Sequence, residues 1–362
     1  DTLEVVTMDK LTGAKVTLVY TVFNNYGAMT RSVKVENPSD KPFYIDTIHS
    51  LCVDLPGYDY DMLGLYGRWV KERALDRYPL HRGIQSIKSK RGSSSHNHNP
   101  FTALVSKNAT EDYGDCYGFN LVYSSNFSID VEVDGFASSR LVMGINPEGF
   151  NWLLNPGEEF YSPEAVLVYS DEGLGGMSRT FHKLYSKHLV RGKWKNIKRP
   201  LLINNWEATG MDFDGDTIVS FAAKAKELGI EMLVMDDGWF GDRKNDKAGL
   251  GDYWVNKKKL PYGLKGLSKD VRKLGLQFGL WFEPEAVNPD SDLYRAHPDW
   301  ALTDDFEPVY GRNQLLLDLT KAEVRDYIVE NVSKILDSAG ITYVKWDMKR
   351  HSIALGEKAH LY

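Results

Sequence analysis

The sequence predicts two domains of different class, an N-terminal antiparallel β-sandwich followed by the first half of a (β/α)8 TIM barrel. Short strand-like runs between turn residues fill the first half of the chain, whereas units of helix, glycine, apolar strand and acidic residue fill the second. The 362 residues exceed one ordinary domain, and 42% hydrophobic residues is enough for two cores. We expect the sandwich at residues 1–172, a helical and basic linker at 173–199, and the catalytic barrel at 200–362.

The expected sandwich is based on five short runs of strand-forming residues, most of which alternate between apolar and polar. They lie at residues 15–22, 32–36, 117–123, 129–133 and 165–169. Turn-forming clusters such as Asn37-Pro-Ser-Asp and Asn155-Pro-Gly separate them. Short strands at this spacing are typical of antiparallel sheets that pack face to face.

The expected linker begins where the apolar period becomes helical. The residues at this spacing are Leu174, Met177, Phe181, Leu184, Tyr185 and Leu189. A basic stretch at 191–199 follows them and ends at Pro200. We place the domain boundary in this stretch.

The second half repeats one unit, in which a helix stops at a glycine and an apolar strand then ends in acidic residues. The predicted helix faces span 218–228, 267–274 and 324–336, their stops are Gly229, Gly275 and Gly340, and the strands are 231–235, 277–282 and 342–346. An opening strand is expected at 201–207, and Thr320 with Glu323 is expected to form a capping box for the third helix. Apolar strands that alternate with helices indicate a parallel sheet covered by helices.

A nucleotide-binding sheet and a barrel both fit this alternation. The first strand–helix junction, Asn204-Asn-Trp-Glu-Ala-Thr-Gly, does not contain the glycine pattern of a dinucleotide site. Acidic residues follow several different strands, as a barrel active site requires, so we favour the barrel. About 160 residues follow Pro200 and hold four strands, whereas a barrel has eight strands, so about half of it is expected here.

Composition excludes some functions. A net charge of −6 and a pI near 5.9 argue against nucleic-acid binding, and no apolar run of about 18 residues predicts a membrane span. The N-terminus has no signal-peptide pattern, and two cysteines in the whole chain, Cys52 and Cys116, suggest a reducing compartment, which we take to be the cytoplasm. Aromatic residues make up 12% of the chain, which suits either large cores or sugar-binding faces.

Polar and aromatic residues gather where the predicted strands end. They are Trp206, Glu207, Asp236, Asp237, Trp239, Trp281, Glu283, Glu285, Lys345 and Asp347. Lys345 and Asp347 are two apart on a strand and therefore face the same side. A lysine beside a carboxylate keeps it ionised, which suits a nucleophile, but a structural ion pair fits the spacing equally well.

The adjacent carboxylates Asp236 and Asp237 allow three interpretations. They could accept hydrogen bonds from sugar hydroxyls, hold Mg²⁺ or Ca²⁺, or simply cap the loop that follows the strand. For Glu283 and Glu285 we favour a structural role, because buried acids at strand ends often pair with neighbouring cations. We expect no metal and no cofactor.

Several long motifs in order resemble the α-galactosidases of glycoside hydrolase family 36. They are Asn204-Asn-Trp-Glu-Ala-Thr, Met235-Asp-Asp-Gly-Trp-Phe-Gly, Gly279-Leu-Trp-Phe-Glu-Pro-Glu, Gly311-Arg-Asn-Gln-Leu and Tyr343-Val-Lys-Trp-Asp-Met, preceded by Gly67-Arg-Trp-Val-Lys-Glu-Arg and Gly92-Ser-Ser-Ser-His-Asn-His-Asn-Pro-Phe. The resemblance runs from about residue 50 to the end. It implies a retaining α-galactosidase that acts on α-galactosides of the raffinose and melibiose type.

The resemblance also assigns residues. Asp347 corresponds to the family's nucleophile, and Asp236, Asp237 and Lys345 would hold galactose hydroxyls. The remaining substrate contacts would come from Trp206, Trp281 and Arg312, and from Trp69 of a neighbouring subunit, because family members are commonly homotetramers.

Two departures from the family pattern affect the site. Lys349 stands where the family usually has Asn, on the same side as Asp347. The Cys- and Gly-rich motif around the family's acid/base Asp is absent before Tyr362, so we expect the acid/base residue not to be present in this chain.

The alternatives are a sister specificity, namely an α-N-acetylgalactosaminidase or a galactosyl transferase, an inactive galactoside-binding fragment, and a metal-dependent barrel hydrolase. The first would be distinguished by residues outside this chain, and the second by a hydrolysis assay. Loss of activity on addition of EDTA would indicate the third.

Overall fold

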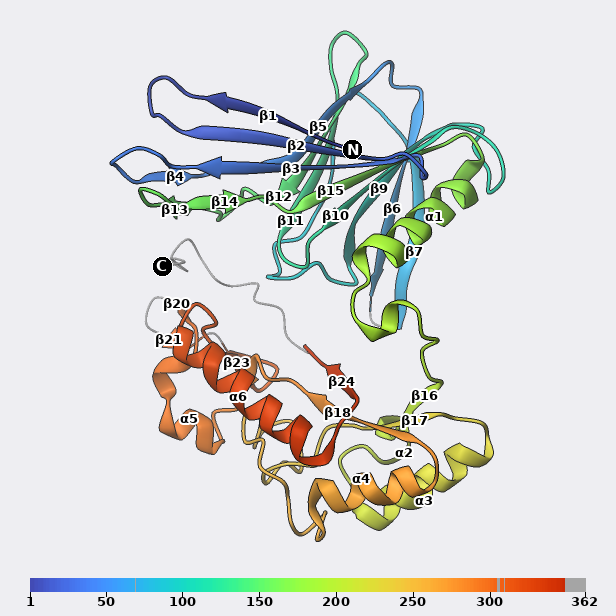
Figure 1. Ribbon diagram of the computed structural model, residues 1–362, viewed down its shortest axis with the longest axis vertical. Coiled ribbons are helices and arrows are strands. Elements are labelled where there is room, and N and C mark those ends of the chain that lie inside the picture. Colours follow the sequence, from blue (N-terminus) through green and yellow to red (C-terminus); the bar gives the residue numbers. More distant parts are fainter. Residues whose placement is uncertain (69, 305–306, 309, 349–362) are drawn as a thin grey trace. The chain divides into compact units, whose positions relative to one another are not determined.

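The computed structural model describes residues 1–362 except 69, 305–306, 309 and 349–362 (Figure 1). The chain divides into two compact units, residues 1–196 and 197–362, which are described separately. The predicted β-sandwich followed by part of a (β/α)8 barrel is confirmed.

The first unit is built from antiparallel strands. They are β1 (Thr2–Met8), β2 (Lys15–Phe23), β3 (Ala28–Glu36), β4 (Phe43–Ile45), β5 (His49–Leu55), β6 (Tyr60–Arg68), β7 (Lys71–Pro79), β8 (Gly83–Lys88), β9 (His98–Ser106), β10 (Cys116–Val122), β11 (Phe127–Val133), β12 (Ser139–Ile145), β13 (Trp152–Leu154), β14 (Glu159–Tyr161) and β15 (Glu164–Ser170). A large sheet has the order β1-β2-β3-β15-β10-β9-β6-β7, with β14 also paired to β3, and a second sheet has the order β5-β12-β11-β8. Strands β4 and β13 form a separate pair.

Period-two alternation explains how the large sheet is covered on both faces. On β9, Leu104 packs in the core between the two sheets, whereas its neighbours Ala103 and Val105 face the other side. Helix α1 (Gly173–Leu184) covers that other side, and its C-terminal end continues as a π-helical turn, η1 (Tyr185–Leu189). A short 3₁₀ turn, η2 (Lys193–Lys195), follows in the basic stretch.

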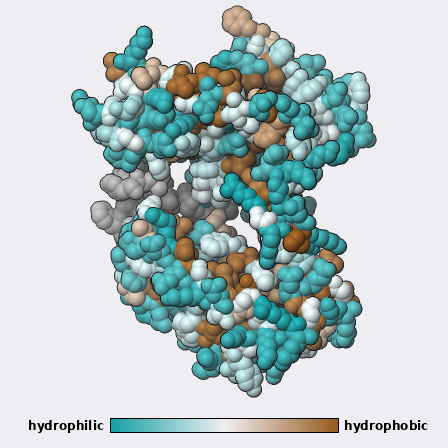
Figure 2. All heavy atoms as spheres, viewed as in Figure 1, coloured by the Kyte–Doolittle hydropathy of each residue, from teal (hydrophilic) through white to brown (hydrophobic). Residues whose placement is uncertain are grey.

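Strand β1 lies at one edge of the large sheet, and all seven of its residues are exposed. Figure 2 shows hydrophobic residues in patches among a mostly hydrophilic surface. Within the residues that the structure describes, no helix is long and apolar enough to cross a membrane.

The two cysteines differ in environment. Cys52 is exposed and Cys116 is buried, and neither forms a disulfide. Burial raises the pKa of Cys116 to about 11, so its thiolate is scarce at neutral pH. We expect Ellman's reagent to titrate one thiol quickly in the native protein and the second only after unfolding. Cys52→Ser should abolish the fast phase, and two fast equivalents in the native protein would contradict this assignment.

The second unit has a parallel sheet of order β16-β17-β18-β24 with helices between its strands. In chain order its elements are β16 (Leu202–Asn204), α2 (Trp206–Thr209), α3 (Gly215–Glu227), β17 (Met232–Met235), α4 (Gly263–Lys273), β18 (Gln277–Phe282), α6 (Ala322–Ala339) and β24 (Tyr343–Trp346). A long connection between β18 and α6 contains β19 (Ala286–Val287), α5 (Asp292–Ala296), the 3₁₀ turn η3 (Pro298–Trp300), β20 (Thr303–Asp304), β21 (Glu307–Pro308), β22 (Tyr310–Gly311) and β23 (Gln314–Leu316).

Helix ends largely follow the predicted signals. Helix α6 ends at Gly340, whose φ of 57° and ψ of 46° are left-handed, a conformation that glycine adopts without penalty. The predicted capping box at its start is wrong. The hydroxyl of Thr320 donates to Asp318 at 2.6 Å, and Lys321, which makes no side-chain cap, occupies the capping position.

Three further details differ from prediction. The opening strand stops at Asn204 because the Asn204 side chain accepts a hydrogen bond from the backbone N–H of Trp206 at 3.0 Å, which turns the chain into α2. Trp206 and Glu207 therefore lie on a helix. Leu189 and Leu228, placed on apolar helix faces, are 45% and 81% exposed because each lies at a helix end, beyond the packed turns.

Candidate active site

The register of the parallel sheet brings side chains from three strands into one row. Met235 on β17 pairs with Leu280, and Trp281 on β18 pairs with Lys345 on β24. Extending the first pairing by one residue places Asp236 level with Trp281 and Lys345. The carboxyl ends of these strands therefore form one cluster, as in the mouth of a barrel.

Asp236 is the buried acid of this row, with 2% of its surface exposed. One of its carboxylate oxygens accepts from Lys345 Nζ at 2.6 Å, and the other from the backbone N–H of Asp237 at 2.9 Å. Its own N–H donates to the side chain of Asn205, which is fully buried. Lys345 was predicted to face Asp347 as a possible ion-pair partner. Its ion pair is instead with Asp236, because the register of β17, β18 and β24 places Lys345 and Asp236 at the same level of the sheet.

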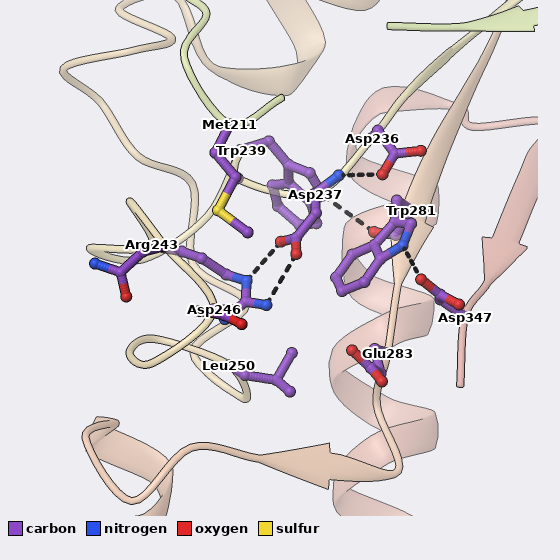
Figure 3. Close-up of polar contacts among 12 residues, drawn as sticks. Met211, Asp236, Asp237, Trp239, Arg243, Asp246, Leu250, Trp281, Glu283 and Asp347 are labelled. Atoms are coloured by element: carbon purple, nitrogen blue, oxygen red, sulfur yellow. Dashed lines mark hydrogen bonds and ion pairs between the residues drawn. The ribbon is translucent and has the colours of Figure 1, made fainter. Parts of the chain in front are cut away.

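Asp237 is fully buried and forms a two-pronged ion pair with Arg243, which is also fully buried (Figure 3). Arg243 Nε and Nη2 donate to the two carboxylate oxygens at 2.5 and 2.8 Å. A pair of this geometry fixes both side chains in position.

Asp347 follows β24 directly and is half-buried. Its Oδ2 accepts from the indole N–H of Trp281 at 3.0 Å and its Oδ1 from the backbone N–H of Met348 at 2.9 Å. Its own N–H continues the sheet ladder to Phe282 at 2.8 Å. Figure 3 shows the Trp281 ring directed at this carboxylate, so a fully buried side chain fixes the position of a more accessible one.

The acids after β18 have partners too. Glu283 is buried and accepts from Gln314 Nε2 at 3.1 Å, while its backbone N–H donates to the hydroxyl of Tyr253 at 3.1 Å. Glu285 accepts from the indole of Trp346 at 2.8 Å. These contacts anchor the long connection to the strand ends.

An aromatic cluster supports the site from beneath. Trp239 is fully buried, contacts the rings of Phe240 and Phe282, and donates from its indole to the backbone oxygen of Trp281 at 3.1 Å. Burial raises the pKa of Tyr253 well above its usual value, so this phenol stays protonated. The cluster is part of the apolar core that packs around the strands whose ends carry the acids.

The other predicted site residues lie on α2, in the long connection, or outside the described residues. Trp206 is half-buried at the start of α2, and Arg312 is exposed in the turn between β22 and β23. Trp69 and Lys349 are outside the described residues. Within the described ranges, no group of three His, Cys, Asp or Glu side chains could hold a metal ion.

Sequence reasoning missed Arg243, Asn205 and Asn288. Each lies in a loop after a strand and is buried by contacts with residues distant along the chain. The spacing of loop residues indicates no partner, so nothing marked Arg243 or Asn288, whereas Asn205 lies in the quoted motif Asn204-Asn-Trp-Glu-Ala-Thr but was given no role.

Comparison with known proteins gives one family. A melibiase model matches residues 159–361, and a model of the glycosyl hydrolase family 36 N-terminal domain matches residues 1–155. The α-galactosidase AgaA of Geobacillus stearothermophilus is 53% identical over 360 residues, which cover 99% of this chain and 49% of AgaA.

Solved structures agree with this match. The crystal structure of AgaA superposes with a TM-score of 0.94 and 54% identity, covering 97% of this chain and 49% of AgaA. A variant of AgaA crystallised in complex with raffinose gives the same TM-score, identity and coverage. The chain thus spans about half the length of the curated relatives it matches.

Proposed function

Because this chain belongs to glycoside hydrolase family 36, we propose that its protein is a retaining α-galactosidase that hydrolyses terminal α-D-galactosyl groups of galacto-oligosaccharides. The observation that carries the proposal is the pair of contacts at neighbouring strand ends. Asp347 is held by the indole of Trp281, and the buried Asp236 is held by Lys345. The raffinose complex of the related AgaA supports the substrate class.

The proposed mechanism is a double displacement with Asp347 as nucleophile. Its carboxylate attacks the anomeric carbon while an acid protonates the leaving oxygen, and the same group then activates water. Trp281 donates one hydrogen bond to Asp347, which orients a carboxylate oxygen without neutralising it. The acid/base carboxyl is expected on a later strand, about 5–5.5 Å from Asp347 in a retaining enzyme.

Substrate binding is proposed for the charged residues around the nucleophile. Asp236 and Asp237 would accept hydrogen bonds from galactose hydroxyls, and Lys345 would donate to one. Arg243 donates to both oxygens of Asp237, which fixes the direction of this carboxylate. Trp206, Trp281 and Arg312 are proposed to complete the pocket, together with Trp69 of a neighbouring subunit.

Hydrolysis assays test the function. The protein should cleave 4-nitrophenyl α-galactoside and raffinose, release galactose first as the α-anomer by NMR, and keep its activity in EDTA. The β-galactoside is the matched control and should not be cleaved. Three results would contradict the proposal. Preference for the N-acetyl-α-galactosaminide would indicate an α-N-acetylgalactosaminidase, and transfer without hydrolysis would indicate a galactosyl transferase. Galactose binding without turnover would indicate an inactive galactoside-binding protein.

We also propose a cytoplasmic homotetramer. The two free cysteines support a reducing compartment, and the resemblance to the family supports the assembly. Light scattering on the purified protein measures the assembly directly, and a monomeric mass at working concentration would contradict it.

A further inference from the structure

The turn between β22 and β23 holds an unusual backbone conformation. Tyr310 pairs with Leu315 and Gly311 with Gln314, so the turn consists of two residues, Arg312 and Asn313. Both have positive φ, 50° and 61°. Hairpin turns of this kind favour glycine or asparagine, and an arginine in the left-handed region is strained by its Cβ. Such a conformation persists only where neighbouring groups hold it.

Two side chains from outside the hairpin contact this turn, and the longer contact runs from Asn313 Nδ2 to Asp246 Oδ2 at 3.4 Å. Asn288, which is fully buried, donates from Nδ2 to the backbone oxygen of Asn313 at 2.6 Å and to that of Asp246 at 3.1 Å. Its Oδ1 accepts from Arg243 Nη1 at 3.0 Å and from the backbone N–H of Leu250 at 2.8 Å. Both donors and both acceptor positions of the amide are therefore used.

The same amide thus contacts two loops that carry proposed substrate contacts. Arg243 holds both oxygens of Asp237, and Asn313 is next to Arg312. We infer that Asn288 is a positioning residue that fixes the Arg312 turn and the Arg243–Asp237 pair in one arrangement. The inference rests on the proposed function only insofar as Arg312 and Asp237 contact the sugar.

The contacts of Asn288 separate into two kinds. Its oxygen serves Arg243, whereas its amino group serves the turn and Asp246. Asn288→Asp keeps the acceptor and removes both donors, so it should release the turn while leaving the Arg243–Asp237 pair in place. Asn256 offers a matched control. It is also buried, and the hydrogen bonds of its side chain within the described part of the chain go to residues of its own loop, Gly241, Lys258 and Lys259.

Hydrogen exchange on the ligand-free protein is the first test. We expect Asn288→Asp to speed the exchange of amides in residues 310–317 by about tenfold, while Asn256→Asp leaves that segment unchanged. If the buried carboxylate of Asn288→Asp prevents folding, Asn288→Thr can be used instead, because it adds no charge. It should also speed amide exchange in residues 310–317. If a folded Asn288 variant exchanged the amides of residues 310–317 as slowly as the wild-type protein does, the inference would be wrong.

A double-mutant cycle on galactose affinity is the second test. Asn288→Asp and Arg312→Ala are each expected to weaken galactose binding by about tenfold, and the double variant should bind no more weakly than Arg312→Ala. A role that is merely structural predicts independent, multiplying losses, and this result would overturn the positioning role. If the wild-type protein does not bind galactose, the proposed function fails, while the exchange measurement still decides whether Asn288 holds the turn.

Discussion

Replacing Arg243 by methionine is expected to destabilise the second unit by about 3–5 kcal/mol. The change leaves Asp237 in a site with no solvent exposure and without its two-pronged partner, and an ion stripped of its partner in such a site is strongly unfavourable. It also removes the donors to Ala248 and Asn288. Urea unfolding followed by tryptophan fluorescence measures the loss, because six of the nine tryptophans lie in residues 200–362.

Arg295→Met is the matched control for this prediction. Arg295 also contacts two aspartates, Asp290 and Asp292, but all three side chains are more than half exposed. Exposed pairs are screened by water and contribute little, so this variant should unfold close to the wild type. An Arg243→Met protein as stable as Arg295→Met would mean that the Asp237 site is not buried in solution.

A double variant distinguishes charge burial from packing. Arg243→Met combined with Asp237→Leu removes both charges, and replacing a buried ion pair by apolar residues is often neutral. We therefore expect the double variant to recover part of the stability, although the oxygens of Ala248 and Asn288 still lack their donor. A double variant less stable than Arg243→Met would indicate that shape rather than charge dominates.

The sequence predicted the regular parts of the fold because local periodicity determines them. Apolar runs predicted the strands at 231–235 and 277–282. The end of the third helix was predicted at Gly340 because glycine tolerates a left-handed backbone. The cluster of acids at strand ends follows from the same reasoning, since parallel strands share one carboxyl edge. These features need no knowledge of distant contacts.

Side-chain contacts between residues that are distant along the chain could not be predicted from local periodicity. Lys345 and Asp347 face one side of a strand, but only the register between β17, β18 and β24 shows that Lys345 meets Asp236. The capping box at Thr320 failed for a similar reason, because a neighbouring aspartate competes for the hydroxyl. Side-chain pairing depends on three-dimensional distance, which spacing along the chain does not contain.

Asp347→Ala is expected to lower kcat by a factor on the order of 10⁴ or more, because the covalent step loses its nucleophile. Galactoside binding should persist, since Asp236, Asp237 and Lys345 keep their contacts with one another and with Arg243. Removing the carboxylate also opens space on the face of the sugar from which Asp347 would attack. A small anion in that space can replace it, so azide should restore turnover of the nitrophenyl substrate.

The product of that rescue identifies the role of the residue. Attack from the position of Asp347 on an α-galactoside yields β-galactosyl azide, whereas a carboxylate acting as acid or base would give the α-azide on rescue. Asp270→Ala removes a partly exposed acid that pairs with Lys273 on α4, and this control variant should keep full activity. A near-normal kcat in Asp347→Ala, or the absence of an azide adduct, would show that another residue is the nucleophile. Asp236 is a poor candidate for that role, because it is buried and its two oxygens already accept from Lys345 and from the backbone N–H of Asp237.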